Sequence, residues 1–170
     1  HAVNIRHVVG QMLPDTVFGC LHQIVADRVP AEGTSSLWNI VAYGQHPPSA
    51  AGNDAGRRWT LMSFHSGGAG ARPAKDGLSA TAFPSGVRNM PVEINEAITP
   101  IVYWRKELRA DSGGAGRHRG GHGQIVELGS IDGQPFVLSA TFDRTVHPAR
   151  GRLGGADGAT GRLYLKGCGQ

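Results

Sequence analysis

Apolar residues recur at four-residue intervals near the start of the chain. The series consists of Val9, Leu13, Val17, Leu21 and Val25. This spacing places apolar side chains on one face of a helix and predicts an amphipathic helix over residues 8–25. Pro14 fits a regular helix only in its first turn, so we expect regular helix from about Leu13, ended by Val29-Pro30. The same pattern predicts that Cys20 is a buried, inert thiol.

Strand-like runs fill much of the remaining chain. They are rich in Val, Ile, Leu and aromatic residues and are bounded by glycine or proline, which is typical of strands. The six runs are Leu37–Tyr43, Trp59–His65, Ile101–Leu108, Gln124–Ser130, Pro135–Phe142 and Arg162–Lys166. Asp132-Gly133 lies between two of them and is a strong hairpin signal. We therefore expect Gln124–Ile131 to pair antiparallel with Gln134–Phe142.

A second, short helix is predicted ahead of the third strand-like run. Asn89 can cap its start, Pro91 fits its first turn, and Thr99-Pro100 ends it. Together these elements predict an α+β fold, with a mostly antiparallel sheet, one main amphipathic helix and one short helix. A length of 170 residues suits a single domain over residues 1–170.

Composition narrows the classes of function. The net charge is +4, and residues 101–170 contain ten basic and six acidic side chains. Aromatic residues make up only 6% of the chain and do not alternate with basic ones, which argues against nucleic-acid binding. No apolar run reaches the roughly 20 residues that a membrane helix needs. The chain opens without a signal-like segment and has only Cys20 and Cys168, so we expect a cytoplasmic location.

The glycine-rich stretch DSGGAGRHRGGHG, residues 111–123, is the most unusual segment. A dinucleotide fingerprint would need glycine at position 119, and a phosphate-binding P-loop would need lysine at position 122, so both patterns fail. His118 and His122 have metal-ligand spacing, but the intervening Arg-Gly-Gly disfavours a helix, and we expect no metal site. A tight connection between strands and a backbone anion nest both remain open.

The segment SGVRNMPVE, residues 85–93, combines a glycine turn with three polar side chains. One interpretation is a structural ion pair between Arg88 and Glu93. The other is functional, with the Arg88 guanidinium and the Asn89 carboxamide at the rim of a polar cleft, orienting a carbonyl or carboxylate group.

A longer stretch, SGVRNMPVEINEAITPIVYWRKELRADSGGAGRHRGGHGQIVELGS, closely resembles the C-terminal part of the hydantoinase B/oxoprolinase family. GQMLPDTVFGCL, RVPAEGTSSLWNI and GGAGARPAKDG also look like segments of that family. The family protein is considerably longer. Its amino-terminal segment with Gly-Gly-Thr-His and Pro-Asp, which is expected to hold a metal, has no match here. The resemblance therefore implies a carboxy-terminal portion of such a protein, inactive by itself.

The resemblance also implies a function. Such proteins act with a hydantoinase A-type partner and use ATP to open cyclic amides such as N-methylhydantoin or 5-oxoproline. ATP and a divalent metal are expected in the complete complex, and no cofactor in this chain. The expected partners are the hydantoinase A-type protein and the amino-terminal part of the hydantoinase B-type protein, with self-association as a further candidate. Two alternatives are a non-catalytic scaffold that docks the partner and a fragment of an ATP-dependent ketone carboxylase.

Two groups of candidate site residues follow from these arguments. The candidate catalytic residues are Arg88, Asn89 and Glu93. The candidate substrate-binding or anion-binding loop residues are Asp111, Ser112, Gly113, Gly114, Arg117 and Arg119. For the loop we favour a role in shape, in which the glycines permit a tight connection. Arg117 and Arg119 would then pair with acidic neighbours or line the cleft.

Overall fold

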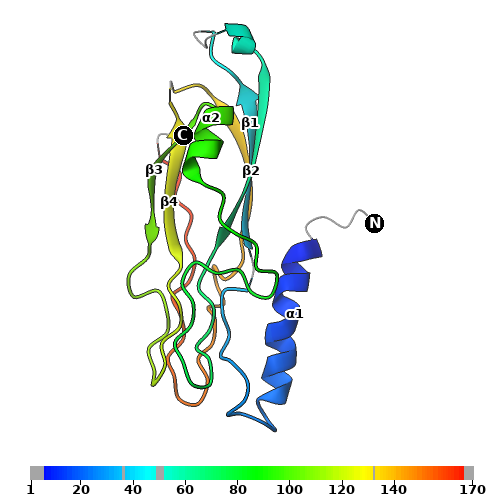
Figure 1. Cartoon of the computed structure of the whole chain (residues 1–170), viewed down its shortest axis with the longest axis vertical. Helices are drawn as coiled ribbons and strands as arrows, with labels where there is room; N and C mark the ends of the chain where they lie inside the picture. Colours follow the sequence, from blue (N-terminus) through cyan, green and yellow to red (C-terminus); the bar gives the residue numbers. More distant parts are fainter. Residues whose placement is uncertain (1–5, 36, 49–51, 132, 167–170) are drawn as a thin grey trace.

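The computed structural model describes residues 6–35, 37–48, 52–131 and 133–166. Over these residues, five strands form a three-stranded antiparallel sheet of order β2-β1-β5 and a two-stranded antiparallel sheet β3-β4 (Figure 1). The strands are β1 (Leu37–Gln45), β2 (Arg58–Ser66), β3 (Ile101–Leu108), β4 (Gln124–Ser130) and β5 (Phe136–Thr141). The helical segments are α1 (Arg6–Leu21), the short 3-10 helix η1 (Gly52–Asp54) and α2 (Val92–Ile98). This architecture confirms the α+β class with mostly antiparallel pairing.

The apolar core lies between the two sheets. On β2, Trp59 and Leu61 are buried and alternate with exposed residues, as expected for a strand with one buried face. They cluster with Ile40 and Ala42 of β1 and with Ile101 of β3. Because Ile101 belongs to the smaller sheet, this cluster holds the two sheets together.

The predicted hairpin around Asp132-Gly133 is wrong in its pairing. β4 pairs with β3, whereas β5 pairs with β1 in the other sheet. Gly133 has the positive φ, +65°, that the turn signal predicts, and Asp132 lies outside the described residues. The local signal is correct, but Phe136 and Leu138 of β5 pack on the core cluster of the larger sheet. The chain therefore crosses from one sheet to the other at this point.

The other strand predictions differ in outcome. Five of the six predicted strands are confirmed, with bounds within two residues of the prediction. The sixth, Arg162–Lys166, forms no strand, and its side chains are exposed. A short run of β-forming residues cannot become a strand without a sheet edge to pair with. None of the described helices is long and apolar enough to cross a membrane.

Helix α1 corrects the prediction for residues 8–25. It begins at Arg6 and ends at Leu21, and Pro14 lies inside it rather than in its first turn. Cys20 is exposed rather than buried. Val9, Leu13, Val17 and Leu21 of the apolar series are also exposed, and Val25 lies beyond the helix. The buried residues of α1 are Val8, Gln11 and Asp15. The helix therefore packs with its more polar face toward the rest of the protein.

Helix α2 confirms the second helix prediction but not its cap. Pro91 occupies the N-cap position without a side-chain hydrogen bond, so Asn89 does not cap this helix. Thr99 ends the helix in extended conformation, as predicted from the following proline. Its backbone amide and its hydroxyl both donate to the Asn95 carbonyl, over 3.1 and 2.8 Å, so the hydroxyl adds a second bond to the helical one at this end.

Below the two sheets, glycine-rich segments outside helices and strands run side by side (Figure 1). We call them the glycine layer, which comprises residues 31–34, 67–70, 77–81, 112–123 and 149–159. Backbone hydrogen bonds connect these segments to one another. The Gly121 amide donates to the Ala69 carbonyl over 2.9 Å, and the Ala69 amide donates to the Leu78 carbonyl over 2.9 Å. The predicted loop at 111–123 is thus one strip of a hydrogen-bonded layer.

The close approach of these backbones leaves no room for side chains. A Cβ atom added to Gly68 would overlap the carbonyl oxygen of Gly121, and one added to Gly121 would overlap that of Leu78. Both obstacles are backbone atoms, which cannot rotate away as a flexible side chain would. Glycine is therefore required here by the distance between chains.

This constraint predicts a large loss of stability when a methyl group is added. We expect Gly68→Ala and Gly121→Ala each to lower the free energy of unfolding by roughly 3 kcal/mol or more. The matched control is Gly10→Ala, because a Cβ at this helical position meets nothing within 4 Å. That change should be neutral or stabilising by up to about 1 kcal/mol. Urea unfolding followed by circular dichroism measures all three, and equal stability of the three variants would contradict the close packing.

Candidate functional site

Arg88 lies at the rim of an open hollow of about 240 Å³. The hollow is lined by Ala80, Thr81, Ala82, Gly86, Val87, Arg88 and Asn89. The Arg88 side chain is exposed, and so is that of Glu93. No ion pair among the described residues connects Arg88 with Glu93, so the predicted structural pair is wrong. Four of the seven lining residues have no polar side chain, and the side chains of Thr81 and Asn89 are uncharged. The Arg88 guanidinium is therefore the only charged group among the residues that line the hollow.

Asn89 is half-buried and holds the segment before α2 in place. Its side-chain amide donates to the Ala80 carbonyl over 3.2 Å, and its oxygen accepts a hydrogen bond from Gln124 over 3.1 Å. The same Gln124 amide donates to the Ser66 carbonyl over 2.6 Å. Asn89 therefore connects the rim of the hollow to β4 and to the end of β2. These bonds use both polar groups of its side chain, which fixes the backbone position of Arg88.

Glu93 faces Lys106 of β3 rather than Arg88. Burial lowers the pKa of Lys106, and the negative charge of Glu93 opposes that shift. The Lys106 ammonium group donates to the Met90 carbonyl over 2.9 Å. The three predicted catalytic residues thus lie along one segment, but only Asn89 is bonded to the layer beneath.

The predicted loop residues have mainly structural contacts. The Ser112 hydroxyl donates to the Arg109 carbonyl over 2.7 Å and accepts from the Gly123 amide over 2.9 Å. Gly113 and Gly114 lie where an added Cβ would overlap the carbonyl oxygens of Gly120 and Ala156. These contacts fit the role in shape that we favour for this loop.

The charged residues of the loop lie at its surface. Asp111 and Arg119 form an exposed ion pair of 3.5 Å, as expected for an arginine with an acidic neighbour. The Arg119 backbone amide also donates to Asp76 over 2.9 Å. Arg117 is exposed. His118 lies 3.6 Å from Asp76, and the described residues contain no group of three or more side chains suited to hold a metal ion.

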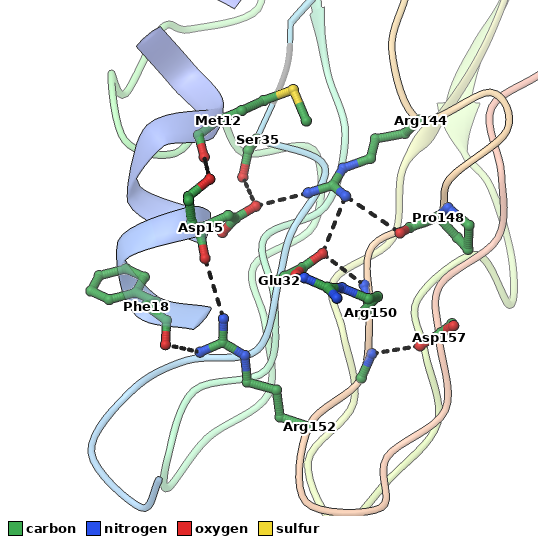
Figure 2. A network of polar contacts seen from close by, with 12 residues as sticks. Met12, Asp15, Phe18, Glu32, Ser35, Arg144, Pro148, Arg150, Arg152 and Asp157 are labelled. Atoms are coloured by element: carbon green, nitrogen blue, oxygen red, sulfur yellow. Dashed lines mark hydrogen bonds and ion pairs between the residues drawn. The ribbon is translucent and has the colours of Figure 1, made fainter. Parts of the chain in front are cut away.

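The sequence analysis missed a buried charge network that holds α1 (Figure 2). Arg144 lies between two carboxylates, at 2.9 Å from Asp15 of α1 and 3.2 Å from Glu32. All three side chains are almost fully buried. The Ser35 hydroxyl donates to Asp15, and Arg150 pairs with Glu32 over 2.7 Å. A buried cation with two anions and further donors is well compensated, which burial of charge requires.

A second arginine fixes the end of α1. Arg152 donates to the carbonyl of Phe18 over 3.0 Å and to that of Asp15 over 3.4 Å (Figure 2). Cations are favourable near the C-terminal end of a helix, where the helix dipole is negative, and here Arg152 shares the Phe18 carbonyl with the His22 amide. One signal in the sequence could have revealed this network: Asp15 is the single carboxylate among the apolar residues of the predicted helix. A carboxylate in that setting needs a cationic partner if it is buried.

The two carboxylates of this network respond differently to their surroundings. Burial raises the pKa of Asp15 above its ordinary value, although Ser35 and Arg144 act in the opposite direction. Burial would also raise the pKa of Glu32, but hydrogen bonds from Arg150 and the charge of Arg144 outweigh it and lower the pKa.

Arg144 and Ser35 both have positive φ, +59° and +53°, which is uncommon for residues other than glycine.

A second missed cluster lies inside the molecule, below α2. His65 of β2 is buried, and its Nε2 atom lies 3.2 Å from the Ser63 hydroxyl. Burial, and then the charge of Lys106, lower the pKa of His65 to about 4. Tyr103 of β3 lies beside the His65 ring and accepts a hydrogen bond from the buried Asn95 of α2 over 3.0 Å. The cluster joins α2 to β3 by a hydrogen bond and β3 to β2 by the contact between the Tyr103 and His65 rings.

The comparison with protein families shows to which family the chain belongs. The family model described as Hydantoinase B/oxoprolinase matches residues 1–169. The chain belongs to the hydantoinase B/oxoprolinase family. The resemblance stated from the sequence is therefore confirmed, and the glycine layer and the hollow at Arg88 lie within the region matched to this family.

Three curated relatives place the chain within larger proteins. It is 38% identical over 100 residues to 5-oxoprolinase 1 of Arabidopsis thaliana, a match that covers 58% of this chain and 8% of the relative. It is 37% identical over 134 residues to the beta chain of the caprolactamase of Pseudomonas jessenii, covering 74% and 22%. It is 30% identical over 158 residues to a Pseudomonas protein provisionally named as the B-type component of a D-/L-hydantoinase, covering 92% and 25%. The chain thus spans a quarter or less of the length of these relatives.

A solved structure shares the fold. The nucleotide-free structure of acetone carboxylase matches with a TM-score of 0.57 at 21% sequence identity. The match covers 81% of this chain and 18% of that one. This likeness shows that the same fold also occurs within a much longer chain.

The buried His65 predicts a loss of stability in mild acid. Because its pKa in the folded protein lies below the ordinary value of 6.5, its contribution to stability is fully present above about pH 6.5. That contribution is lost as the pH falls toward 4, and we expect it to reach about 3 kcal/mol. His65→Gln should flatten this part of the pH profile, whatever its effect at pH 7.5. The control His147→Gln, at an exposed position, should keep the full slope. Urea unfolding between pH 7.5 and 4.5 measures the slopes, and identical slopes for His65→Gln and the unmodified chain would contradict a buried neutral histidine.

Proposed function

We propose that this chain is part of an ATP-dependent enzyme that opens cyclic amides together with a hydantoinase A-type partner. The observation that carries the proposal is the family match over residues 1–169, combined with the names of the curated relatives. Oxoproline, hydantoin and caprolactam differ in ring size and substituents, but each contains an amide bond within a ring. The common substrate class is therefore a cyclic amide, and we expect other parts of the complex to select the individual substrate.

Within such an enzyme, the chain contributes shape and one exposed guanidinium group. The glycine layer and the hydrogen bonds of Asn89 hold the segment of Arg88 in a fixed position. A guanidinium at the rim of an open hollow can bind a carboxylate with two parallel hydrogen bonds, or donate to a single carbonyl oxygen. We assign to Arg88 the orientation of such a group on the substrate or on the partner surface.

We assign ATP and the divalent metal to other parts of the complex rather than to this chain. A phosphate cradle needs backbone amides that point at the ligand. In the glycine layer the amides of Gly77 and Gly121 instead donate to carbonyls of neighbouring segments, over 2.7 and 2.9 Å, and that of Gly120 donates to the Gly114 carbonyl of its own segment over 2.9 Å. The described residues also offer no cluster of metal-binding side chains. We therefore derive no catalytic step of this chain through either group.

The alternative of a non-catalytic docking scaffold is favoured by one observation. Ser112, Gly113 and Gly114 of the predicted binding loop are engaged in internal contacts. These internal contacts favour a scaffold, because Ser112, Gly113 and Gly114 contact the protein itself and hold the shape of the loop. The alternative of a ketone carboxylase has weaker support, because the acetone carboxylase likeness at 21% identity speaks for the fold alone.

The proposal is tested by placing the chain in the setting of its relatives. We expect a chimera of the Pseudomonas jessenii caprolactamase beta chain, with its matched region replaced by this chain, to assemble with the A-type partner. The chimera should form ADP and the ring-opened amino acid from a cyclic amide. The isolated chain should form neither product with ATP, Mg²⁺ or Mn²⁺. Hydantoin, oxoproline, caprolactam, and acetone with bicarbonate serve as the substrate panel.

Two outcomes would favour the alternatives. A folded, assembled chimera without activity on the amides would favour the scaffold, and activity on acetone alone would favour the carboxylase.

Arg88 can be examined separately from the overall activity. Arg88→Lys keeps the charge but loses the two-pronged hydrogen bonding, so activity of the assembled complex should fall about tenfold or more. The free energy of unfolding should change by less than about 0.5 kcal/mol, because the side chain is exposed. Arg28→Lys, at another exposed arginine, is the matched control and should leave both quantities unchanged.

Glu93→Gln completes the comparison, since a buried pair with Arg88 would make both variants lose several kcal/mol. Full activity of Arg88→Lys would remove Arg88 from the site. A large loss of stability in both Arg88→Lys and Glu93→Gln would instead restore the structural pair.

A further inference from the structure

Gln124 is the first residue of β4 and directly follows the glycine-rich stretch, residues 111–123. Its side-chain nitrogen carries two hydrogens, and each has an acceptor. One bond goes to the Ser66 carbonyl at the end of β2 over 2.6 Å, and the other goes to the side-chain oxygen of Asn89 over 3.1 Å. A carboxamide nitrogen has two donors and no more, so these two contacts use the whole donor capacity of Gln124.

The backbone at Gln124 is itself held in place. Gln124 pairs with Leu108 at the end of β3. The preceding Gly123 donates its amide to the Ser112 hydroxyl over 2.9 Å, and its carbonyl accepts from the Arg109 amide over 2.9 Å. Because Ser112 and Gly123 lie near opposite ends of the glycine-rich stretch, these bonds close the stretch into a loop. The closed loop fixes the point from which the Gln124 side chain extends.

Asn89 depends on Gln124 for half of its side-chain bonding. Its nitrogen donates to the Ala80 carbonyl over 3.2 Å, and its oxygen accepts from Gln124. Without the Gln124 donor, the Asn89 side chain would keep a single bond. Arg88, the next residue toward the N-terminus, is exposed and takes part in no ion pair among the described residues. The position of Arg88 is therefore set through its neighbour Asn89.

We propose that Gln124 is a positioning residue that acts on the candidate site through Asn89 and Arg88. The task of the glycine-rich stretch is then specific, because it places the Gln124 carboxamide where it reaches two segments at once. A guanidinium on a segment that is already held loses less conformational freedom when it binds its target group. The effect on activity rests on the proposed function, whereas the effect on the order of the Arg88 segment does not.

Two substitutions separate the donor bonds of Gln124 from the space that its side chain fills. Gln124→Met keeps a similar length and volume without any donor. Gln124→Glu keeps the shape but places an oxygen opposite two oxygen acceptors. Gln134→Met is the matched control, because Gln134 is also half-buried and its side chain forms no hydrogen bond within the part of the chain that the structure describes.

Backbone ¹⁵N relaxation of the chain by itself is the first test and requires no activity. In Gln124→Met and Gln124→Glu, the heteronuclear NOE of residues 86–90 should fall, while that of β1 stays unchanged. Gln134→Met should leave both regions unchanged. NOE values at residues 86–90 equal to those of the unmodified chain would overturn the proposal, and so would a loss of order that extends into β1.

A measurement on the unmodified chain decides the outcome if both Gln124 variants unfold. The side-chain amide hydrogens of Gln124 should exchange with solvent more slowly than those of the exposed Gln45, because both are engaged in hydrogen bonds. Equal exchange rates at Gln124 and Gln45 would overturn the proposal.

The assembled chimera is the second test, once the unmodified chain has shown activity in it. Gln124→Met should lower activity about fivefold or more, in the same parameter, kcat or KM, that Arg88→Lys lowers or raises. In the Arg88→Lys background, Gln124→Met should have less than about a twofold further effect, because a residue that acts through Arg88 then has little left to position. Multiplicative effects of the two substitutions would overturn this route of action. An inactive chimera with the unmodified chain would count against the proposed function alone, and the relaxation data would then decide on Gln124.

Discussion

Backbones packed against backbones are the constraint on which the rest of this structure depends. In the glycine layer, carbonyl oxygens of one segment occupy the space where a neighbouring residue would carry its Cβ atom, as at Gly68 and Gly121. The layer contains the connections that follow β2 and β3 and is joined to α1 through Arg144, which donates to Thr34 and Glu32. It also carries Ala80, the anchor of Asn89 and hence of Arg88. A shift of this layer would therefore move the hollow, the charge network and both sheets.

The glycine layer has few large apolar side chains, and its Leu78 and Leu153 are exposed, so it contributes little apolar burial. The other stabilising contacts are therefore concentrated in two places. One is the core cluster around Leu61 and Ile101 between the sheets. The other is the charge network, where Arg144 connects α1 to the body of the protein. Removing one partner from a buried ion pair typically costs about 3–5 kcal/mol, because the remaining charge is left without compensation. In this protein the bonds of Asp15 to Arg144 and of the Phe18 carbonyl to Arg152 hold one side of α1 toward the body of the protein.

The sequence predicted the local features well and the long-range ones poorly. Strand positions were correct because runs such as Ile101–Leu108 combine β-forming residues with clear boundaries. The pairing of β5 was predicted wrongly, because Asp132-Gly133 specifies a turn and cannot specify which sheet edge is free. The outward face of α1 was misassigned because an apolar stripe usually marks the buried side. The side of α1 that is buried is instead set by the partners of Asp15, which are Arg144 and Ser35. Both partners lie far from Asp15 in the chain, so the helical pattern could not reveal them. The roles of Arg88 and Glu93 stay predictions, although their geometry separates them from each other.

The central claim is that the glycine-rich segments form a packed, hydrogen-bonded layer. Amide hydrogen exchange measured by NMR at single residues tests it most directly. The amides of Ala69, Gly77 and Gly121, which donate to neighbouring segments, should exchange as slowly as those of β1 in the centre of the larger sheet. Val146 and His147 are exposed, and their amides donate to no acceptor among the described residues, so these two amides should exchange rapidly. Rapid exchange at Ala69, Gly77 and Gly121, comparable to that at Val146 and His147, would contradict the account and identify the segments as mobile loops.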